Sequence, residues 1–300
     1  MVLASIGWQP TWWSILQSTF MRHAFIGGTL LAVAAGMIGY FVVIRQSAFV
    51  AHALAHVGFP GATGAVLVGA PVIVGLAVFT IGGGLVIGAL GRRAATREVA
   101  TGTILALATA LGILFSSMAS QNTRGLTNIL FGNLLVISTP QLVVYSAFTA
   151  AIVVVLGFVA RPLLFASIDP TVAAARGVPV GALGTVFLVL MALVVTMAVQ
   201  VVGTLLLFAL VVTPAAAALR ITARPLHVVG LATSIGTGSV WLGLVLSAMF
   251  NLPPSFAIVT LAVAVWGGVL AATGDRHRAA AANIGHDGHH PHEATHVHGH

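Results

Sequence analysis

Long apolar runs dominate the chain and predict helices that cross a membrane. A spanning helix needs about 20 mostly apolar residues, because the hydrocarbon core of a bilayer is ~30 Å thick. The charged residues before residue 274 fall at or near the ends of such runs. The fold class that follows is all-α, a polytopic membrane helical bundle. Its nine predicted spans lie at about 24–44, 49–70, 72–90, 98–118, 140–160, 180–200, 202–220, 226–249 and 255–273.

Composition and charge support an integral membrane protein. Hydrophobic residues make up 59% of the chain and charged residues only 6%, against about 25% charged residues in soluble domains. The net charge of +7 comes from twelve Arg residues in short clusters between the runs. This arrangement favours the positive-inside rule over a nucleic-acid partner. We expect a lipid bilayer as partner, no nucleic acid and a cytoplasmic C-terminus.

Two residue types are missing, and their absence excludes whole classes of site. The chain has no Cys, so disulfides and thiolate metal sites are excluded. It also has no Lys, so it lacks the phosphate-binding loop of ATPases. No nucleophile elbow or zinc-protease helix occurs either, and we expect no catalytic residues.

A histidine pair is the main candidate for chemistry. His52 and His56 are four residues apart inside an apolar run, so on a helix they share one face. Imidazole is the commonest metal ligand in proteins, and such a pair can hold one Zn²⁺ or a similar ion. Gly58, Pro60 and Gly61 follow at once and predict a broken helix beside the pair, with Pro60 on the pathway. The alternative is that each ring only hydrogen-bonds a neighbouring helix carbonyl.

Two further polar or helix-breaking positions lie in the run from 183 to 219. Gln200 either faces the same pathway or forms a hydrogen bond between helices, and the second is favoured. Pro214 kinks its helix and frees a carbonyl. That kink is either structural or part of a gate.

The connection 161–179 predicts a short helix on the cytoplasmic face. Asp169 followed by Pro170 is typical of a helix start, and Gly177 of a helix end. The helix, which includes Ala173 and Arg176, is either an ordinary loop helix or a docking site for a cytosolic partner.

The chain divides into a transmembrane domain, 1–274, and a tail, 275–300. The tail has no apolar face, so we expect it to be disordered. His-rich tracts bind metal, which makes the tail a second, weaker candidate site. Its histidines in question are His286, His289, His290, His292, His296, His298 and His300.

The few acidic residues leave no carboxylate relay through the membrane. Three of the five belong to the tail, and the other two, Glu98 and Asp169, lie near the predicted cytoplasmic face. A secondary metal transporter, which needs an intramembrane coupling group, is therefore the weaker alternative. A second alternative is a membrane scaffold or metal sensor in which only the tail is active.

Several stretches together resemble the permease subunits of bacterial ABC importers for zinc, manganese and iron(II). They occur in the family's order and span most of residues 20–273. They are VVIRQSAFVAHALAHVGFPGATGAVLVG (42–69), Leu130-Phe131-Gly132-Asn133, the Asp169 to Gly177 loop, Gln200 to Gly203 running on to Thr213-Pro214, and Ser247 to Pro253-Pro254.

The resemblance implies a homodimeric transport subunit that is not itself an enzyme. It implies a cytosolic ATP-hydrolysing subunit docking on Asp169, Ala173, Arg176 and Gly177, and an extracytoplasmic metal-binding protein that delivers the ion. The family's carboxylate–histidine pair falls on His52 and His56, and here a histidine replaces the carboxylate. Because imidazole suits Zn²⁺ and carboxylate suits Mn²⁺, we expect Zn²⁺ as cargo, with Mn²⁺ or Fe²⁺ as alternatives and no permanently bound cofactor.

Overall fold

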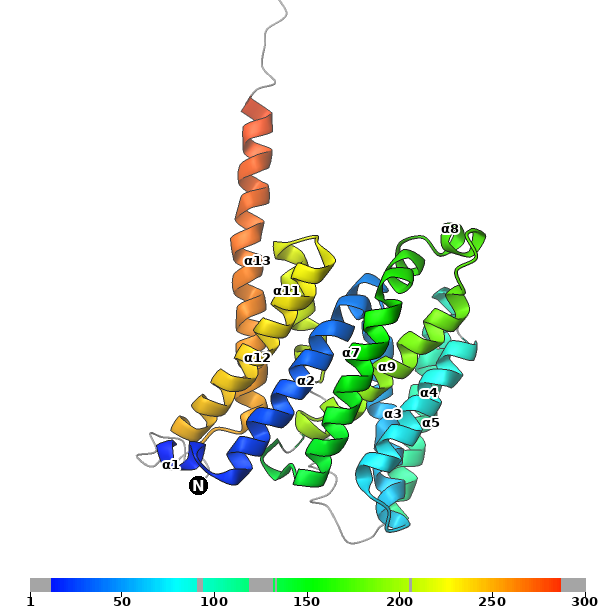
Figure 1. The fold of residues 1–300 in the computed structure, drawn as a ribbon, viewed down its shortest axis with the longest axis vertical. Coiled ribbons are helices and arrows are strands. Elements are labelled where there is room, and N and C mark those ends of the chain that lie inside the picture. The colour runs from blue at the N-terminus through cyan, green and yellow to red at the C-terminus, as the bar shows by residue number, and fades with distance from the viewer. Residues whose placement is uncertain (1–11, 91–93, 119–131, 133, 205–206, 287–300) are drawn as a thin grey trace, which may run out of the picture.

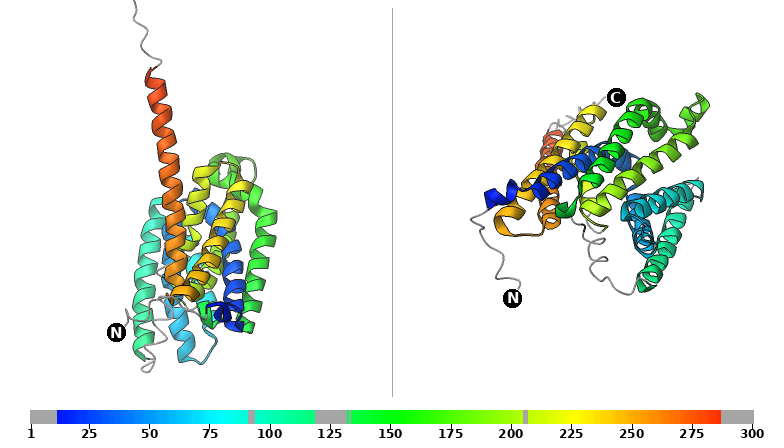
Figure 2. Two further views of the ribbon diagram at one scale, coloured as in Figure 1. Left: turned by 90° about the vertical axis from the view of Figure 1, so that its left-hand side faces the viewer. Right: turned by 60° about the horizontal axis from the view of Figure 1, so that its bottom comes forward.

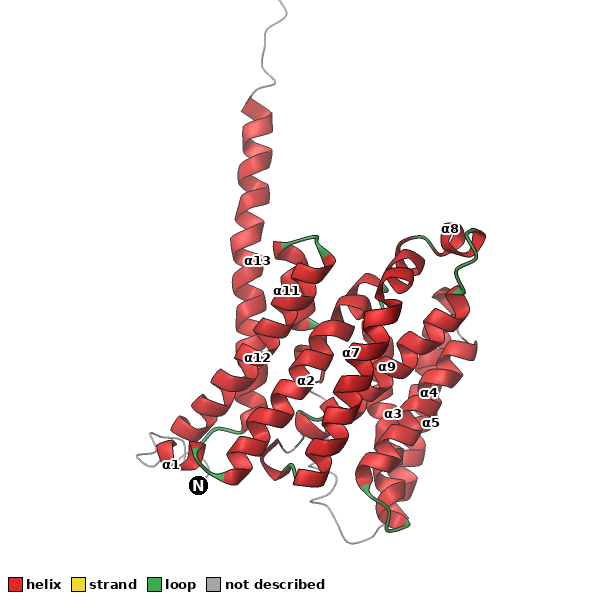
Figure 3. Ribbon diagram, in the orientation of Figure 1, coloured by secondary structure: helices red, strands yellow, loops and turns green. Residues whose placement is uncertain are grey.

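The structure, a computed structural model, describes residues 12–90, 94–118, 132, 134–204 and 207–286. Over these residues the chain consists of helices and loops (Figure 3). The elements are α1 (Trp12–Leu16), α2 (Thr19–Ile44), α3 (Ala48–Leu67), α4 (Val72–Leu90), α5 (Ala94–Met118), the 3₁₀ turn η2 (Leu134–Val136), α7 (Thr139–Ile168), α8 (Pro170–Ala175), α9 (Val180–Val201), α10 (Leu207–Val211), α11 (Thr213–Ile221), α12 (Pro225–Phe250) and α13 (Pro254–His286).

Eight of the described helices are long and apolar enough to cross a membrane. They are α2, α3, α4, α5, α7, α9, α12 and α13, and they overlap eight of the nine predicted spans. The predicted span 202–220 is wrong as a single helix, because α10 and α11 share that stretch. The helical bundle itself is confirmed.

The predicted break beside the histidine pair is also wrong. Helix α3 continues through Pro60, which is buried within it. Proline removes only one hydrogen bond of the helix, and Gly58 and Gly61 instead allow close packing on α4. A Cβ on Gly61 would overlap the carbonyl oxygen of Gly75. The glycines therefore serve a tight α3–α4 crossing, and this packing holds the helix together across the proline.

The helical path is interrupted instead between the end of α9 and the start of α11. Gly203 has φ +85°, in the left-handed region that favours glycine, and follows the end of α9. Pro214 lies in the first turn of α11, where its missing N–H costs nothing. Gly132 packs so closely against this break that a Cβ on it would overlap the backbone of Gly203. Gly132 is followed by the turn η2, which leads into α7.

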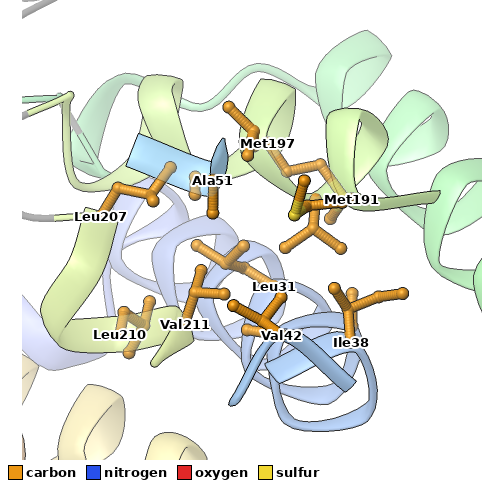
Figure 4. Close-up of a cluster of buried hydrophobic side chains, with 14 of the residues drawn as sticks. Leu31, Ile38, Val42, Ala51, Met191, Met197, Leu207, Leu210 and Val211 are labelled. Atoms are coloured by element: carbon orange, nitrogen blue, oxygen red, sulfur yellow. The ribbon is translucent and has the colours of Figure 1, made fainter. Parts of the chain in front are cut away.

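The helices form two groups that meet along α9. Figure 2 (right) shows α3, α4 and α5 grouped on one side, and α2, α12 and α13 on the other. Between the groups lies a core of fully buried apolar side chains from α2, α3, α9 and α10 (Figure 4). Its members include Leu31, Ile38, Val42, Ala51, Met191, Met197, Leu207, Leu210 and Val211.

One end of the bundle carries the arginine-bearing connections. Figure 1 shows α8 and the α11–α12 turn at this end, from which α13 also projects. Arg176, Arg220 and Arg224 belong to these segments. The cytoplasmic C-terminus that the arginine clusters predict stays a prediction.

The predicted tail differs from the structure in its first part. Helix α13 runs on through Asp275 to His286, so these residues are helical rather than disordered. The four consecutive alanines 279–282 explain this, because alanine is the strongest helix former. Residues 287–300 lie outside the described part of the chain.

We expect Gly61→Ala to destabilise the fold, because the added Cβ would overlap the backbone of Gly75. Overpacking of this kind costs about 1–3 kcal/mol. Thermal unfolding of the detergent-solubilised protein measures the loss. Gly82→Ala on α4 is the matched control, since nothing lies within 4 Å of a Cβ there. Equal stability of the two variants would contradict the tight crossing.

Candidate functional site

The histidine pair lies on the membrane-spanning helix α3 with its two rings in contact. The ring centroids of His52 and His56 are 4.8 Å apart, and the ring planes are inclined by 74°. Both side chains are half-buried. The predicted sharing of one helical face is therefore confirmed, and both rings can present a nitrogen to the same small volume.

The two rings belong to a stripe on α3 that the described part of the chain leaves partly uncovered. Phe49, which is 47% exposed, precedes His52 by one turn, and the half-buried Phe59 follows His56 by nearly one turn. The opposite side of α3, with Leu54, is fully buried in the core. Because a polar ring facing lipid is costly, this stripe is suited to a water-filled passage or to protein.

The described part of the chain supplies few strong metal donors. Among the described residues, no group of three or more His, Asp, Glu or Cys side chains is close enough to hold an ion together. The pair alone thus offers two imidazole nitrogens. Pro60 has no N–H to donate to the His56 carbonyl one turn earlier, so this carbonyl lacks its usual helical donor.

Gln200 lies at the end of α9 and joins it to α7. The Tyr145 hydroxyl donates to Gln200 Oε1 over 2.7 Å, and Tyr145 is fully buried. This is the hydrogen bond between helices that the sequence favoured for Gln200. A role of Gln200 on the pathway stays a prediction.

A pair of threonines was missed by the sequence analysis. The hydroxyls of Thr80 on α4 and Thr196 on α9 lie 2.8 Å apart, and both side chains are fully buried. Thr196 precedes Gln200 by one turn of α9. The two contacts tie α9 to α4 and to α7 just before the chain breaks at Gly203. No local signal distinguishes these threonines from the many others in the spans.

The segment leading into α7 packs inside the bundle, near the end of α9. His23 on α2 has its Nδ1 2.9 Å from the carbonyl oxygen of Ile137, and Leu134 is 1% exposed. The sequence analysis did not single out His23. Since Gly132 also contacts the α9–α10 break, this segment connects α2 to the break.

Pro214 is placed at a helix start instead of within a helix. It is buried in the first turn of α11, next to Val212, which separates α10 from α11. The irregularity is confined to Val212, which keeps right-handed helical backbone angles, and the Val212 N–H still donates to the Phe208 carbonyl over 2.9 Å, so the feature is the kink that the sequence predicted. Its role as a gate stays a prediction, as does the role of Pro60.

The predicted short helix is confirmed as α8. Asp169 accepts a hydrogen bond from the Val172 N–H over 2.9 Å, and Gly177 has φ +80° after the helix ends. Ala173 is fully buried, whereas the Arg176 guanidinium lies 5.9 Å from the centre of the Phe165 ring. The helix is held to the bundle on one side and exposed on the other, at the end shown in Figure 1.

The histidines of the tail contribute little that can be described. His286 is the last residue of α13. The other six predicted tail ligands, from His289 to His300, lie outside the described residues, and the tail site stays a prediction.

The sequence matches a family described as the ABC 3 transport family over residues 17–272. Among its relatives is the "Manganese transport system membrane protein MntC" of Listeria monocytogenes, with 29% identity over 84% of this chain and 90% of that protein. The "Manganese import system permease protein ScaB" of Streptococcus gordonii is also 29% identical, over 80% of this chain and 86% of the relative.

Two solved structures have the same fold. "PsaBC from Streptococcus pneumoniae in complex with Fab" matches with a TM-score of 0.78 and 26% identity, over 90% of this chain and 95% of that chain. A structure described as an inward-facing conformation of a metal-chelate type ABC transporter matches with a TM-score of 0.64 and 18% identity, over 89% and 93% of the two chains. At that identity the second likeness concerns the fold alone.

We expect Tyr145→Phe to lower stability, because it leaves the half-buried Gln200 oxygen without its donor. An unsatisfied buried acceptor costs about 1–3 kcal/mol. The Tyr145→Phe/Gln200→Met double variant should recover much of this loss, since both polar partners are then gone. Thermal unfolding in detergent measures both, with Ser146→Ala, at an exposed neighbour, as control. A Tyr145→Phe protein as stable as the parent would refute the importance of this bond.

Proposed function

The chain belongs to the ABC 3 transport family, and from this premise we propose that it is the membrane permease subunit of an ATP-driven importer of Mn²⁺. The observation that carries the proposal is the histidine pair on α3. His52 and His56 place two neutral donors in contact, half-buried, in a span free of charged side chains. Such donors can strip part of the hydration shell from a dication and release it again.

The relatives support manganese as the cargo. The curated permeases MntC and ScaB are named for manganese transport or import.

Zn²⁺ is the second candidate, because both side-chain donors are imidazoles. The expectation of zinc drawn from the sequence therefore ranks behind manganese, which the relatives favour.

A second copy of the permease would complete the site. The stripe of α3 that includes Phe49, His52 and His56 is partly uncovered in one protomer. If two copies pair across this face, their four imidazoles surround one passage, and an arriving ion can be shared without being enclosed by either copy alone. The homodimer thus supplies both the cover for the stripe and the missing donors.

ATP hydrolysis would take place on a separate cytosolic subunit. The chain has no Lys and hence no phosphate-binding loop of its own. The exposed side of α8, with Asp169 as its N-cap, is the surface on which we expect that subunit to dock. The arginine-bearing end, and with it the C-terminus, would then be cytoplasmic in a bacterial plasma membrane.

An extracytoplasmic metal-binding protein would deliver the ion at the opposite end, and the His-rich tail would capture metal after release.

The decisive experiment is uptake of radiolabelled Mn²⁺ into cells or proteoliposomes that contain the permease with its ATPase. We expect His52→Ala and His56→Ala each to lower uptake at limiting metal by about tenfold or more, equivalent to ~1.4 kcal/mol of lost ion stabilisation. His227→Ala is the matched control, because this exposed histidine lies in the first turn of α12, far along the chain from α3.

Normal transport by both histidine variants would refute the coordination site. Uptake by the parent without any ATPase would refute the importer class and favour a secondary transporter. Loss of all function on deletion of residues 287–300 alone would favour the tail-only sensor.

We expect His52→Asp to change the preference of the transporter between metals. A carboxylate oxygen is a harder donor than imidazole nitrogen and favours Mn²⁺ over Zn²⁺. Competition uptake with labelled Mn²⁺ and unlabelled Zn²⁺ measures the shift, and inhibition by zinc should weaken in the variant. His52→Asn separates the effect of the oxygen from that of its charge. An unchanged competition curve would mean that residue 52 does not contact the ion.

A further inference from the structure

Arg45 lies in a rigid turn between α2 and α3. The Ser47 N–H donates to the Val42 carbonyl over 2.9 Å and the Gln46 N–H to the Val43 carbonyl over 3.1 Å, with Gln46 at φ 51°. This is the Schellman arrangement, which fixes the path of the chain after a helix. The Ser47 hydroxyl also donates to the Arg45 carbonyl over 3.1 Å. A displacement of Arg45 therefore passes directly to the first turn of α3.

The side chain of Arg45 contacts two other helices at the same end of the bundle. Its Nη1 donates to the Ser167 hydroxyl at the end of α7 over 3.0 Å. Its guanidinium carbon lies 5.1 Å from the centre of the Phe187 ring on α9. One charged group thus connects the α2–α3 turn to both α7 and α9.

These two helices are the ones that flank the predicted docking helix α8. Ser167 precedes Asp169, the N-cap of α8, by two residues, and α9 begins at Val180, shortly after Gly177 ends the segment. A subunit that pulls on α8 therefore moves the two groups that Arg45 holds. On the other side of the turn, His52 is the fifth residue of α3, a little over one helical turn from its start.

Unfilled space borders Arg45 between the α2–α3 turn and α9. A cavity of about 60 Å³ is lined by Arg45, Ser47, Val50, Gly184 and Phe187, among others. Protein interiors are otherwise close-packed. The contacts of Arg45 with α7 and α9 thus lie beside a local packing gap.

We propose that Arg45 is a positioning residue that carries the motion of the docking segment to the histidine-bearing helix. It holds Ser167 and Phe187 through its guanidinium, and it moves α3, with His52 and His56, through the rigid turn. Arginine suits the task because its planar group donates to a hydroxyl while its face packs on an aromatic ring. The inference rests on the proposed function, since it assigns a route by which ATP hydrolysis reaches the metal site.

The test compares metal transport with ATP hydrolysis in the same proteoliposomes, which contain the permease and its ATPase. For Arg45→Gln we expect ATP hydrolysis to continue while the number of Mn²⁺ ions imported per ATP falls at least about fivefold, the lower end of couplings between distant sites. Arg45→Lys keeps the charge but loses the fork, so we expect an intermediate ratio. Arg220→Gln is the matched control, an exposed arginine at the same end.

A second variant tests the route itself. Ser167→Ala should lower the ratio partly, and Arg45→Gln/Ser167→Ala should be no worse than Arg45→Gln alone, because both changes break one connection. Equilibrium Mn²⁺ binding to the permease should stay unchanged in all of them, since the histidine pair is intact. This measurement separates lost coupling from a damaged metal site.

The outcomes distinguish the inference from the proposed function. If the parent imports no Mn²⁺ with ATP, the proposed function fails. If the parent transports and Arg45→Gln keeps its ratio of ions to ATP, only the inference fails. Hydrolysis and transport that fall together would also overturn it, because that pattern indicates a structural role. Should Arg45→Gln not fold, Arg45→Lys and Ser167→Ala decide by the same ratio.

Discussion

The interior of a bilayer tolerates almost no charge, and this constraint shapes the choice of polar side chains within the described spans. Arg45 and Asp169 lie at helix ends. Within the spans the donors are neutral groups such as the imidazoles of His52 and His56, the amide of Gln200 and the hydroxyls of Thr80 and Thr196. An ion that enters this bundle has to be held by neutral donors, and an imidazole pair is the strongest set that the described spans offer.

Small residues decide which helices stay whole. On α3 the cost of Pro60 is one hydrogen bond, and the close contact of Gly61 with the backbone of Gly75 offsets it through packing. Between α9 and α11 the balance is reversed, because Gly203 adopts a left-handed backbone and Pro214 needs the start of a helix. The helix interruption thus lies beside Gln200, away from the histidine pair in the sequence.

The sequence was sufficient for those features that depend on local chemistry. Apolar runs of about twenty residues predicted the eight spans that the described helices form. The Asp169-Pro170 start and the Gly177 end predicted α8. Each of these signals lies within one element. The sequence failed on Pro60, since the compensating contact comes from another helix, and on the first part of the tail, where a run of alanines outweighs the lack of an apolar face. The contact between Arg45 and Ser167 joins residues 122 positions apart, and no local pattern predicts it.

A continuous α3 changes how transport has to work. Had the helix broken at Pro60, the histidines could have moved on a local hinge, independently of the rest of the bundle. Since α3 is one rigid rod anchored on α4, the pair can change its surroundings only when the whole helix shifts or when its neighbours move past it. Force must then enter at an end of α3, and the end that begins at Ala48 is joined by the Arg45 turn to the helices on either side of α8. Any motion that passes from the proposed docking helix α8 to the proposed metal site therefore has to enter α3 at one of its ends.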